Sequence, residues 1–106
     1  MVIAVLAFIY PKEDKVERLK EISKDTAEWV KANEPGTLSY HWSETVEDGK
    51  PVFVVNESYK DEAAVEAHKN STKFKELVEL GQKEDLFAKP FKILILNEFA
   101  GFASRL

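Results

Sequence analysis

The order in which strand and helix patterns alternate along the chain leaves few folds open to it. Residues 2–9 form an unbroken apolar run rich in β-branched side chains, which predicts a strand buried on both faces. Residues 12–33 repeat apolar side chains every three to four positions, which predicts a long amphipathic helix. This helix should end before Pro35-Gly36, because the pair breaks helices and starts turns. Residues 37–46 and 51–59 flank an Asp-Gly pair and predict a β-hairpin.

The second half of the chain adds helical segments and a last strand. Asp61 can cap a helix over residues 62–69, and Ser71 can cap a second segment that closes near Gly81. Residues 91–99 are again mostly apolar and predict a fourth strand. The order is therefore β-α-β-β-α-β, the ferredoxin-like split βαβ arrangement of an α+β protein with a four-stranded antiparallel sheet. At 106 residues, positions 1–106 form one domain.

Both faces of the predicted sheet are apolar, although helices in this topology cover only one. The side chains of the first strand are apolar at both parities, with Ile3, Val5, Ala7 and Ile9 on one face and Ala4, Leu6 and Phe8 on the other. A second copy of the same sheet is the simplest cover for the remaining face. We therefore expect a homodimer with sheet packed on sheet.

Composition excludes several classes of function. The chain has 15 Lys and Arg against 19 Asp and Glu, a net charge of −4, and so offers no basic surface for nucleic acid. No apolar run approaches the roughly 20 residues that span a bilayer, and the N-terminus lacks a signal-peptide pattern. With no cysteine and two histidines, we expect neither a metal nor a cofactor. We expect an intracellular protein, cytoplasmic or, if the terminal Ser104-Arg105-Leu106 acts as an import signal, peroxisomal.

One series of residues carries a resemblance that spans nearly the whole chain. The series is Glu34-Pro35-Gly36-Thr37-Leu38, Tyr40, Trp42, Glu57-Ser58-Tyr59-Lys60-Asp61, Ala63 or Ala64, His68, Ser71 and Phe74. It resembles the antibiotic biosynthesis monooxygenase (ABM) domain of the dimeric α+β barrel superfamily. The resemblance implies a dimer with a pocket between each sheet and its own helices. It also implies one of several activities: cofactor-free oxygenation of electron-rich aromatics, isomerisation, haem degradation or none. Haem-degrading relatives are expected to carry an Asn in the first strand, where this chain has Ala7-Phe8-Ile9-Tyr10.

Three of these residues can form a polar group in an apolar space. Glu57 and Tyr59 share a strand face with Phe53 and Val55, and His68 lies on the apolar side of its helix. A buried carboxylate needs a hydrogen-bond donor, and His68 is the nearest candidate in the motif. A histidine held by a carboxylate can act as a general base near neutral pH. Both residues could equally be structural hydrogen-bonding groups.

Several aromatic residues are candidates for the lining of such a pocket. Tyr40 and Trp42 alternate onto the same strand face as Leu38, and either pack in the core or line a pocket for an aromatic ligand. Our hypothesis makes His68 the base, Glu57 its orienter, and Tyr40, Trp42, Tyr59 and Phe74 the substrate-binding residues of a cofactor-independent monooxygenase. The alternatives are a non-catalytic dimeric module that binds a small hydrophobic ligand, and an isomerase or cyclase that uses the same pocket.

Overall fold

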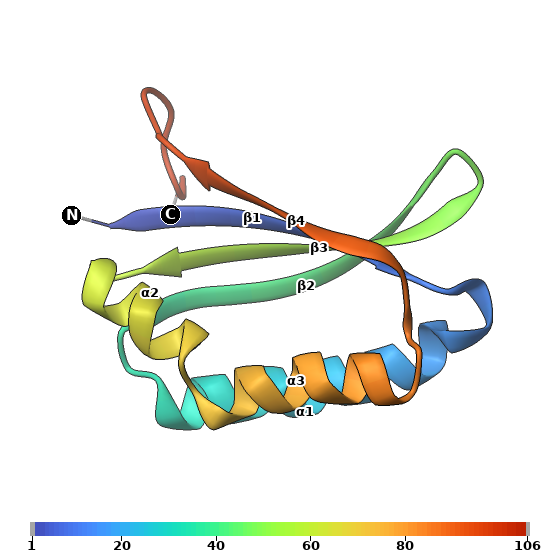
Figure 1. The fold of residues 1–106 in the computed structure, drawn as a ribbon. Helices are drawn as coiled ribbons and strands as arrows, with labels where there is room; N and C mark the ends of the chain where they lie inside the picture. The colour runs from blue at the N-terminus through green and yellow to red at the C-terminus, as the bar shows by residue number, and fades with distance from the viewer. Residues whose placement is uncertain (1, 106) are drawn as a thin grey trace.

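The computed structural model describes residues 2–105, in which helices pack against one face of an antiparallel sheet (Figure 1). The elements are β1 (Ile3–Pro11), the 3₁₀ turn η1 (Glu13–Lys15), α1 (Val16–Asn33), β2 (Thr37–Glu47), β3 (Lys50–Tyr59), α2 (Glu62–Lys69), α3 (Thr72–Lys83) and β4 (Phe87–Leu96). The strands lie in the order β2-β3-β1-β4, and all neighbours are antiparallel. The predicted ferredoxin-like fold is confirmed.

Short polar side chains set the turns and helix starts, as the sequence predicted. Asp48 and Gly49 both adopt positive φ, at 52° and 75°, which a two-residue type I′ hairpin turn requires. The Asp61 side chain accepts a hydrogen bond from a backbone N–H in the first turn of α2, and the Ser71 hydroxyl does the same for α3. Each cap satisfies one of the N–H groups that a helix start leaves without a partner.

The hydrophobic core lies between the sheet and the pair α1 and α3. From the sheet it receives Ala7 and Ile9 of β1 and Phe53 and Val55 of β3, and from the helices Leu19, Ile22 and Leu77, with Leu86 just before β4. Two of these residues, Leu19 and Leu86, have no exposed surface. The sheet face that these strands turn toward the helices is the one on which the candidate site is built.

The opposite face of the sheet, which we call the open face, has no element over it in residues 2–105 (Figure 1). Its apolar side chains come from β1 (Ala4, Leu6 and Phe8), β3 (Val54) and β4 (Leu94 and Leu96). Leu94 and Leu96 are 39% and 41% exposed. One-sided helix cover is thus confirmed, whereas the second sheet remains a prediction.

Strand β4 begins and ends earlier than predicted, at Phe87–Leu96 instead of 91–99. The observed strand includes Pro90, although proline cannot donate to a sheet ladder. However, β4 is an edge strand, and its pairing with β1 is irregular between Phe8 and Pro11, opposite this proline. Edge strands and bulges are the places where a sheet tolerates proline.

Leu38 does not share the buried face of Tyr40 and Trp42, so that prediction is wrong. The pairing of β2 with β3 shifts between Thr37 and Ser39, which leaves Leu38 at an irregularity of the strand. Leu38 is 54% exposed. An extra residue of this kind breaks the two-residue alternation on which the sequence argument depended.

Two expectations concern location. In residues 2–105, none of the helices combines the length and apolar character that a membrane crossing needs. The tripeptide Ser104-Arg105-Leu106 ends at a residue outside the described range, so the import signal stays a prediction.

Candidate active site

A cavity of about 450 Å³ opens between the helix-covered face of the sheet and the helices α2 and α3. All six residues predicted to form the site line it: Tyr40, Trp42, Glu57, Tyr59, His68 and Phe74. The rest of the wall is mainly apolar and includes Val5 and Ala7 of β1, Val55 of β3 and Leu77 of α3. A largely apolar cavity with a few convergent polar groups is typical of a small-molecule site.

His68 is buried and is held by a carboxylate at one ring nitrogen. Its Nδ1 lies 2.8 Å from Oε1 of Glu34, and the two residues are only 5% and 9% exposed. Because a carboxylate can only accept, Nδ1 carries the hydrogen and donates it. In the neutral ring the other nitrogen, Nε2, is then unprotonated and can accept a proton.

Glu34 reaches His68 because of the turn between α1 and β2. Glu34 closes α1, its own N–H donating to the carbonyl of Val30 at 2.9 Å, and the Thr37 hydroxyl donates to Glu34 Oε1 at 2.9 Å. A Cβ added at Gly36 would lie 2.7 Å from Cβ of Ala64, so the turn packs directly on α2. Ala64 and His68 are four residues apart on that helix, and the close approach therefore brings His68 to Glu34.

Glu57 lies on the other side of the imidazole and is held by a phenol. Its Oε1 accepts a hydrogen bond from the Tyr59 hydroxyl and lies 4.0 Å from Nε2 of His68. Burial raises the pKa of Glu57, and the charge of Glu34 adds to this, while the Tyr59 hydrogen bond and His68 oppose it. Burial also raises the pKa of Tyr59, with a further contribution from the Glu57 charge. The imidazole is thus flanked by two carboxylates, one at each ring nitrogen.

The structure assigns the hydrogen-bonding roles differently from the sequence prediction. We expected Glu57 to orient His68, but Glu34 is its hydrogen-bond partner, and the donor to Glu57 is Tyr59 instead of His68. Glu34 belongs to the motif that carries the family resemblance, but no role was predicted for it. The sequence feature that could have indicated a role for Glu34 is its position immediately before Pro35-Gly36. At that position the chain leaves a helix and must turn back toward the sheet.

Aromatic rings enclose the imidazole. The rings of Tyr40, Tyr59 and Phe74 have centroids 5.3, 5.5 and 5.4 Å from that of His68. Trp42 packs edge-on against Tyr40 at 6.1 Å. Burial raises the pKa of Tyr40, the Glu57 charge adds to the shift, and the nearby indole N–H of Trp42 opposes it. These distances fit an enclosure that can accept a flat ring by edge or face contact.

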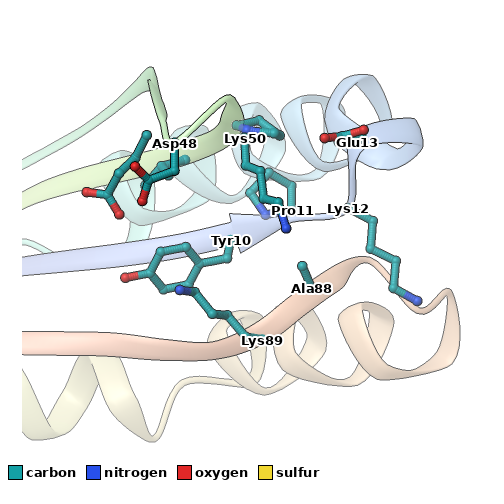
Figure 2. A pocket seen from close by; sticks show the side chains of 11 residues that line it. Tyr10, Pro11, Lys12, Glu13, Asp48, Lys50, Ala88 and Lys89 are labelled. Atoms are coloured by element: carbon teal, nitrogen blue, oxygen red, sulfur yellow. The ribbon is translucent and has the colours of Figure 1, made fainter.

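A larger cavity, about 590 Å³, lies near the β2–β3 turn and has a different character (Figure 2). Charges of both signs line it, and several are already matched: Lys12 pairs with Asp85, and the Lys89 ammonium lies 4.2 Å from the centre of the Tyr10 ring. No histidine lines it. Within residues 2–105, no cluster of three or more His, Asp or Glu side chains is arranged as a metal site. The cavity around His68 is therefore the stronger candidate for chemistry.

Comparison with known proteins identifies the family and the fold. The family model described as antibiotic biosynthesis monooxygenase matches residues 2–80. A Caulobacter crescentus structure described as a candidate antibiotic biosynthesis monooxygenase has 26% identity and a TM-score of 0.81, with 93% of this chain and 91% of that chain covered. A Nitrosomonas europaea protein of the same description has 25% identity and a TM-score of 0.79, with 92% and 89% covered. Rv0793 of Mycobacterium tuberculosis shares the fold at 22% identity and a TM-score of 0.81, with 97% and 100% covered. Among curated proteins, none matches the sequence.

Proposed function

This chain belongs to the antibiotic biosynthesis monooxygenase family, and from that premise we propose that the cavity around His68 carries out cofactor-independent monooxygenation. The substrate class is a small electron-rich aromatic or enolisable compound. The observation that supports this most directly is the buried bond between His68 Nδ1 and Glu34 Oε1, at 2.8 Å. It leaves Nε2 as a proton acceptor in a cavity lined by aromatic rings.

The reaction needs a base and a protected anion. His68 Nε2 removes a proton from a C–H or O–H group that is acidified by the substrate ring. The resulting carbanion gives its electrons to dioxygen and, with a proton, forms a hydroperoxide. Loss of water from the hydroperoxide leaves a ketone, so that CH₂ and O₂ become C=O and H₂O. The protein supplies position, a proton acceptor and an apolar enclosure.

The two carboxylates have distinct parts in this scheme. Glu34 fixes the ring orientation and the tautomer of His68. Glu57, with Oε1 4.0 Å from Nε2, stabilises the imidazolium that forms when the base takes up its proton. Tyr59 holds Glu57 in place through its hydroxyl. Removal of a proton is also the first step of an isomerisation through an enolate, which the same residues would support.

The test is oxygen uptake by the purified protein with anthrone-like compounds and quinols. Wild type should consume oxygen above the uncatalysed rate, and His68→Gln should lose about 100-fold or more, the usual contribution of a positioned base. Glu34→Gln should also lower the rate, whereas the same chemical change at the exposed Glu66 should not. Product analysis separates the alternatives. A rearranged product without oxygen uptake indicates an isomerase, and binding without any conversion indicates a ligand-binding module.

We also propose that the protein is a homodimer formed through the open face of the sheet. The accessible surface is 7437 Å², about 1,400 Å² more than the roughly 6,000 Å² expected for a folded monomer of this mass. The difference is of the size that a stable interface removes from each partner. The apolar side chains of the open face are the part of the surface that a second sheet would cover.

Light scattering after size exclusion tests this assembly. Wild type should elute with twice the 12.1 kDa mass of the chain. Leu94→Lys, on the open face of β4, should shift the mass to that of the monomer. Ile95→Lys, one residue along and on the opposite face of the same strand, should not. A wild type that is monomeric at micromolar concentration would contradict the proposal.

A further inference from the structure

The last strand is followed by residues 97–105, which we call the C-terminal tail. Every residue of this tail is exposed, and its two phenylalanines, Phe99 and Phe102, are 96% and 73% exposed. The tail rises from the sheet on the side away from the helices (Figure 1). It therefore adds two aromatic rings to the apolar surface of the open face, and an apolar surface of this kind marks an interaction site.

A cavity that the proposed chemistry does not use lies on the same side of the sheet. It is the cavity of about 590 Å³ near the β2–β3 turn, which we call the hairpin cavity (Figure 2). Tyr10 and Val52 in its wall continue the alternation of Phe8 and Val54, and so belong to the open face. Its buried lining residues, Pro11 and Val52, are apolar, whereas most of its charged residues are exposed. An apolar floor with a charged rim suits an aromatic side chain of a partner protein.

The tail and the hairpin cavity lie at opposite ends of the open face. The tail begins beyond the pair of Leu96 with Ala4, near the start of β1, whereas the cavity lies at Tyr10 and Pro11, at the end of that strand. Figure 1 shows the tail and the β2–β3 turn both rising away from the helices, one at each end of the sheet. A two-fold axis that runs across the strands, between two facing sheets, exchanges these ends. Such a dimer brings each tail to the hairpin cavity of the partner, and the contact occurs twice.

The charges of the two segments are complementary. At the turn, Glu47 and Asp48 line the cavity and make no ion pair within residues 2–105. The tail carries Arg105, whose guanidinium carbon lies 5.1 Å from the centre of the Phe102 ring. A ring and a cation side by side in the tail thus match an apolar floor beside two carboxylates.

The tail also accounts for part of the surface that the proposed homodimer has to cover. A buried aromatic side chain removes about 150–250 Å² from solvent, so the two phenylalanines of one tail remove about 300–500 Å². The accessible surface of 7437 Å² exceeds that of a typical monomer by about 1,400 Å² per chain. Docking of the tail would therefore supply about a third of the area that a partner is expected to bury.

We propose that the C-terminal tail of each protomer docks in the hairpin cavity of its partner. The Phe102 ring packs against the partner's Tyr10 and Val52, and Arg105 lies beside the acidic residues of the partner's turn. Phe99, nearer to β4, covers apolar side chains of the partner's open face. This inference does not depend on the proposed chemistry. It rests on the proposed homodimer and adds to it an exchange of tails that fixes how the two sheets face each other.

Introduced thiols can map the contact, because the chain has no cysteine. Chains with Ala103→Cys, in the tail, and chains with Lys50→Cys, in the hairpin cavity, are co-expressed with different tags and treated with a short bis-maleimide. We expect a covalent species of twice the 12.1 kDa chain mass, because each mixed dimer places one tail thiol at one cavity thiol. Ala103→Cys with Lys31→Cys, an exposed position on α1, should give none.

The crosslinking results separate this inference from the homodimer itself. Crosslinking of Ala103→Cys chains with one another would mean that tail meets tail, and would overturn the exchange. Absence of the mixed species from a sample that light scattering shows to be dimeric would also overturn the exchange, and would leave the homodimer intact. If the sample is monomeric, both proposals fail.

A matched pair of serine variants provides a second measurement. Phe102→Ser should raise the dimer dissociation constant by about 100-fold, tenfold for each of the two symmetric contacts. Val46→Ser is the control, because Val46 is 69% exposed, lies on the opposite face of β2 from Glu47 and does not line the cavity. It should change the constant less than about twofold. Equal constants for Phe102→Ser and wild type in sedimentation equilibrium, or equal losses in the two variants, would contradict the docking of the tail.

Discussion

The substitution Gly36→Ala tests how the candidate site is held together. The added Cβ would lie 2.7 Å from Cβ of Ala64, while two methyl carbons in contact are about 3.5–4.0 Å apart. The turn and α2 must therefore separate by about 1 Å. This movement would lengthen the bond between His68 and Glu34 from 2.8 Å to nearly 4 Å, beyond hydrogen-bonding distance.

The expected cost follows from that bond. Loss of a buried hydrogen bond to a charged group costs about 1.5–3 kcal/mol of stability. Alanine has a smaller conformational entropy than glycine in the unfolded chain, which offsets about 0.4–1 kcal/mol of this loss. We therefore expect a net loss of about 1–2 kcal/mol, which lowers Tm by roughly 5–15 °C in a domain of this size. Oxygen uptake should fall with it, because His68 loses its orienting partner.

A double-mutant cycle with Ala64→Gly separates this mechanism from a general effect of the substitution. Ala64→Gly alone should cost about 0.5–1 kcal/mol, because glycine weakens a helix. The double variant should recover both Tm and oxygen uptake relative to Gly36→Ala, with a favourable coupling of about 1 kcal/mol or more. The reasoning is refuted if Gly36→Ala melts within about 1 °C of wild type, or if the two costs simply add.

Three further predictions concern charge, packing and capping. Burial raises the pKa of Glu57 above its ordinary 4.5. The proton on Glu57 therefore stabilises the folded state fully below pH 4.5, and this stabilisation is lost as the pH rises through the raised pKa. In thermal melts from pH 4 to 8, the free energy of unfolding of Glu57→Gln should therefore increase relative to that of wild type as the pH rises, by up to about 1.4 kcal/mol per unit of pKa shift. A difference in stability that does not change with pH would contradict this. In Gly81→Ala the new Cβ would lie 1.9 Å from the Phe87 ring, so urea unfolding should show a loss of about 1–3 kcal/mol that disappears in a Phe87→Ala background. Asp61→Ala removes the acceptor for the Ala64 N–H and should cost about 1 kcal/mol, with chemical denaturation as the measurement and an unchanged midpoint as the contrary result.

Local signals explain why so much of the site was predictable. Strand parity put Glu57 and Tyr59 on the face of Val55, and helix spacing put His68 on the buried side of α2. Each of these placements can be predicted from the two-residue period of a strand or the 3.6-residue period of a helix alone. The same reasoning failed at Leu38, because an irregularity in β2 pairing changes the parity without an obvious sequence signal.

The sequence by itself determined the element order, the caps of α2 and α3, the hairpin turn and six of the residues that line the cavity. All of these depend on interactions within a few residues or on the period of one strand or helix. Only the tertiary structure decided which carboxylate holds His68, since Glu34 and His68 are 34 positions apart and meet through the close packing of Gly36 on Ala64. Contacts of this kind depend on how whole elements pack, and no local pattern in the chain specifies them.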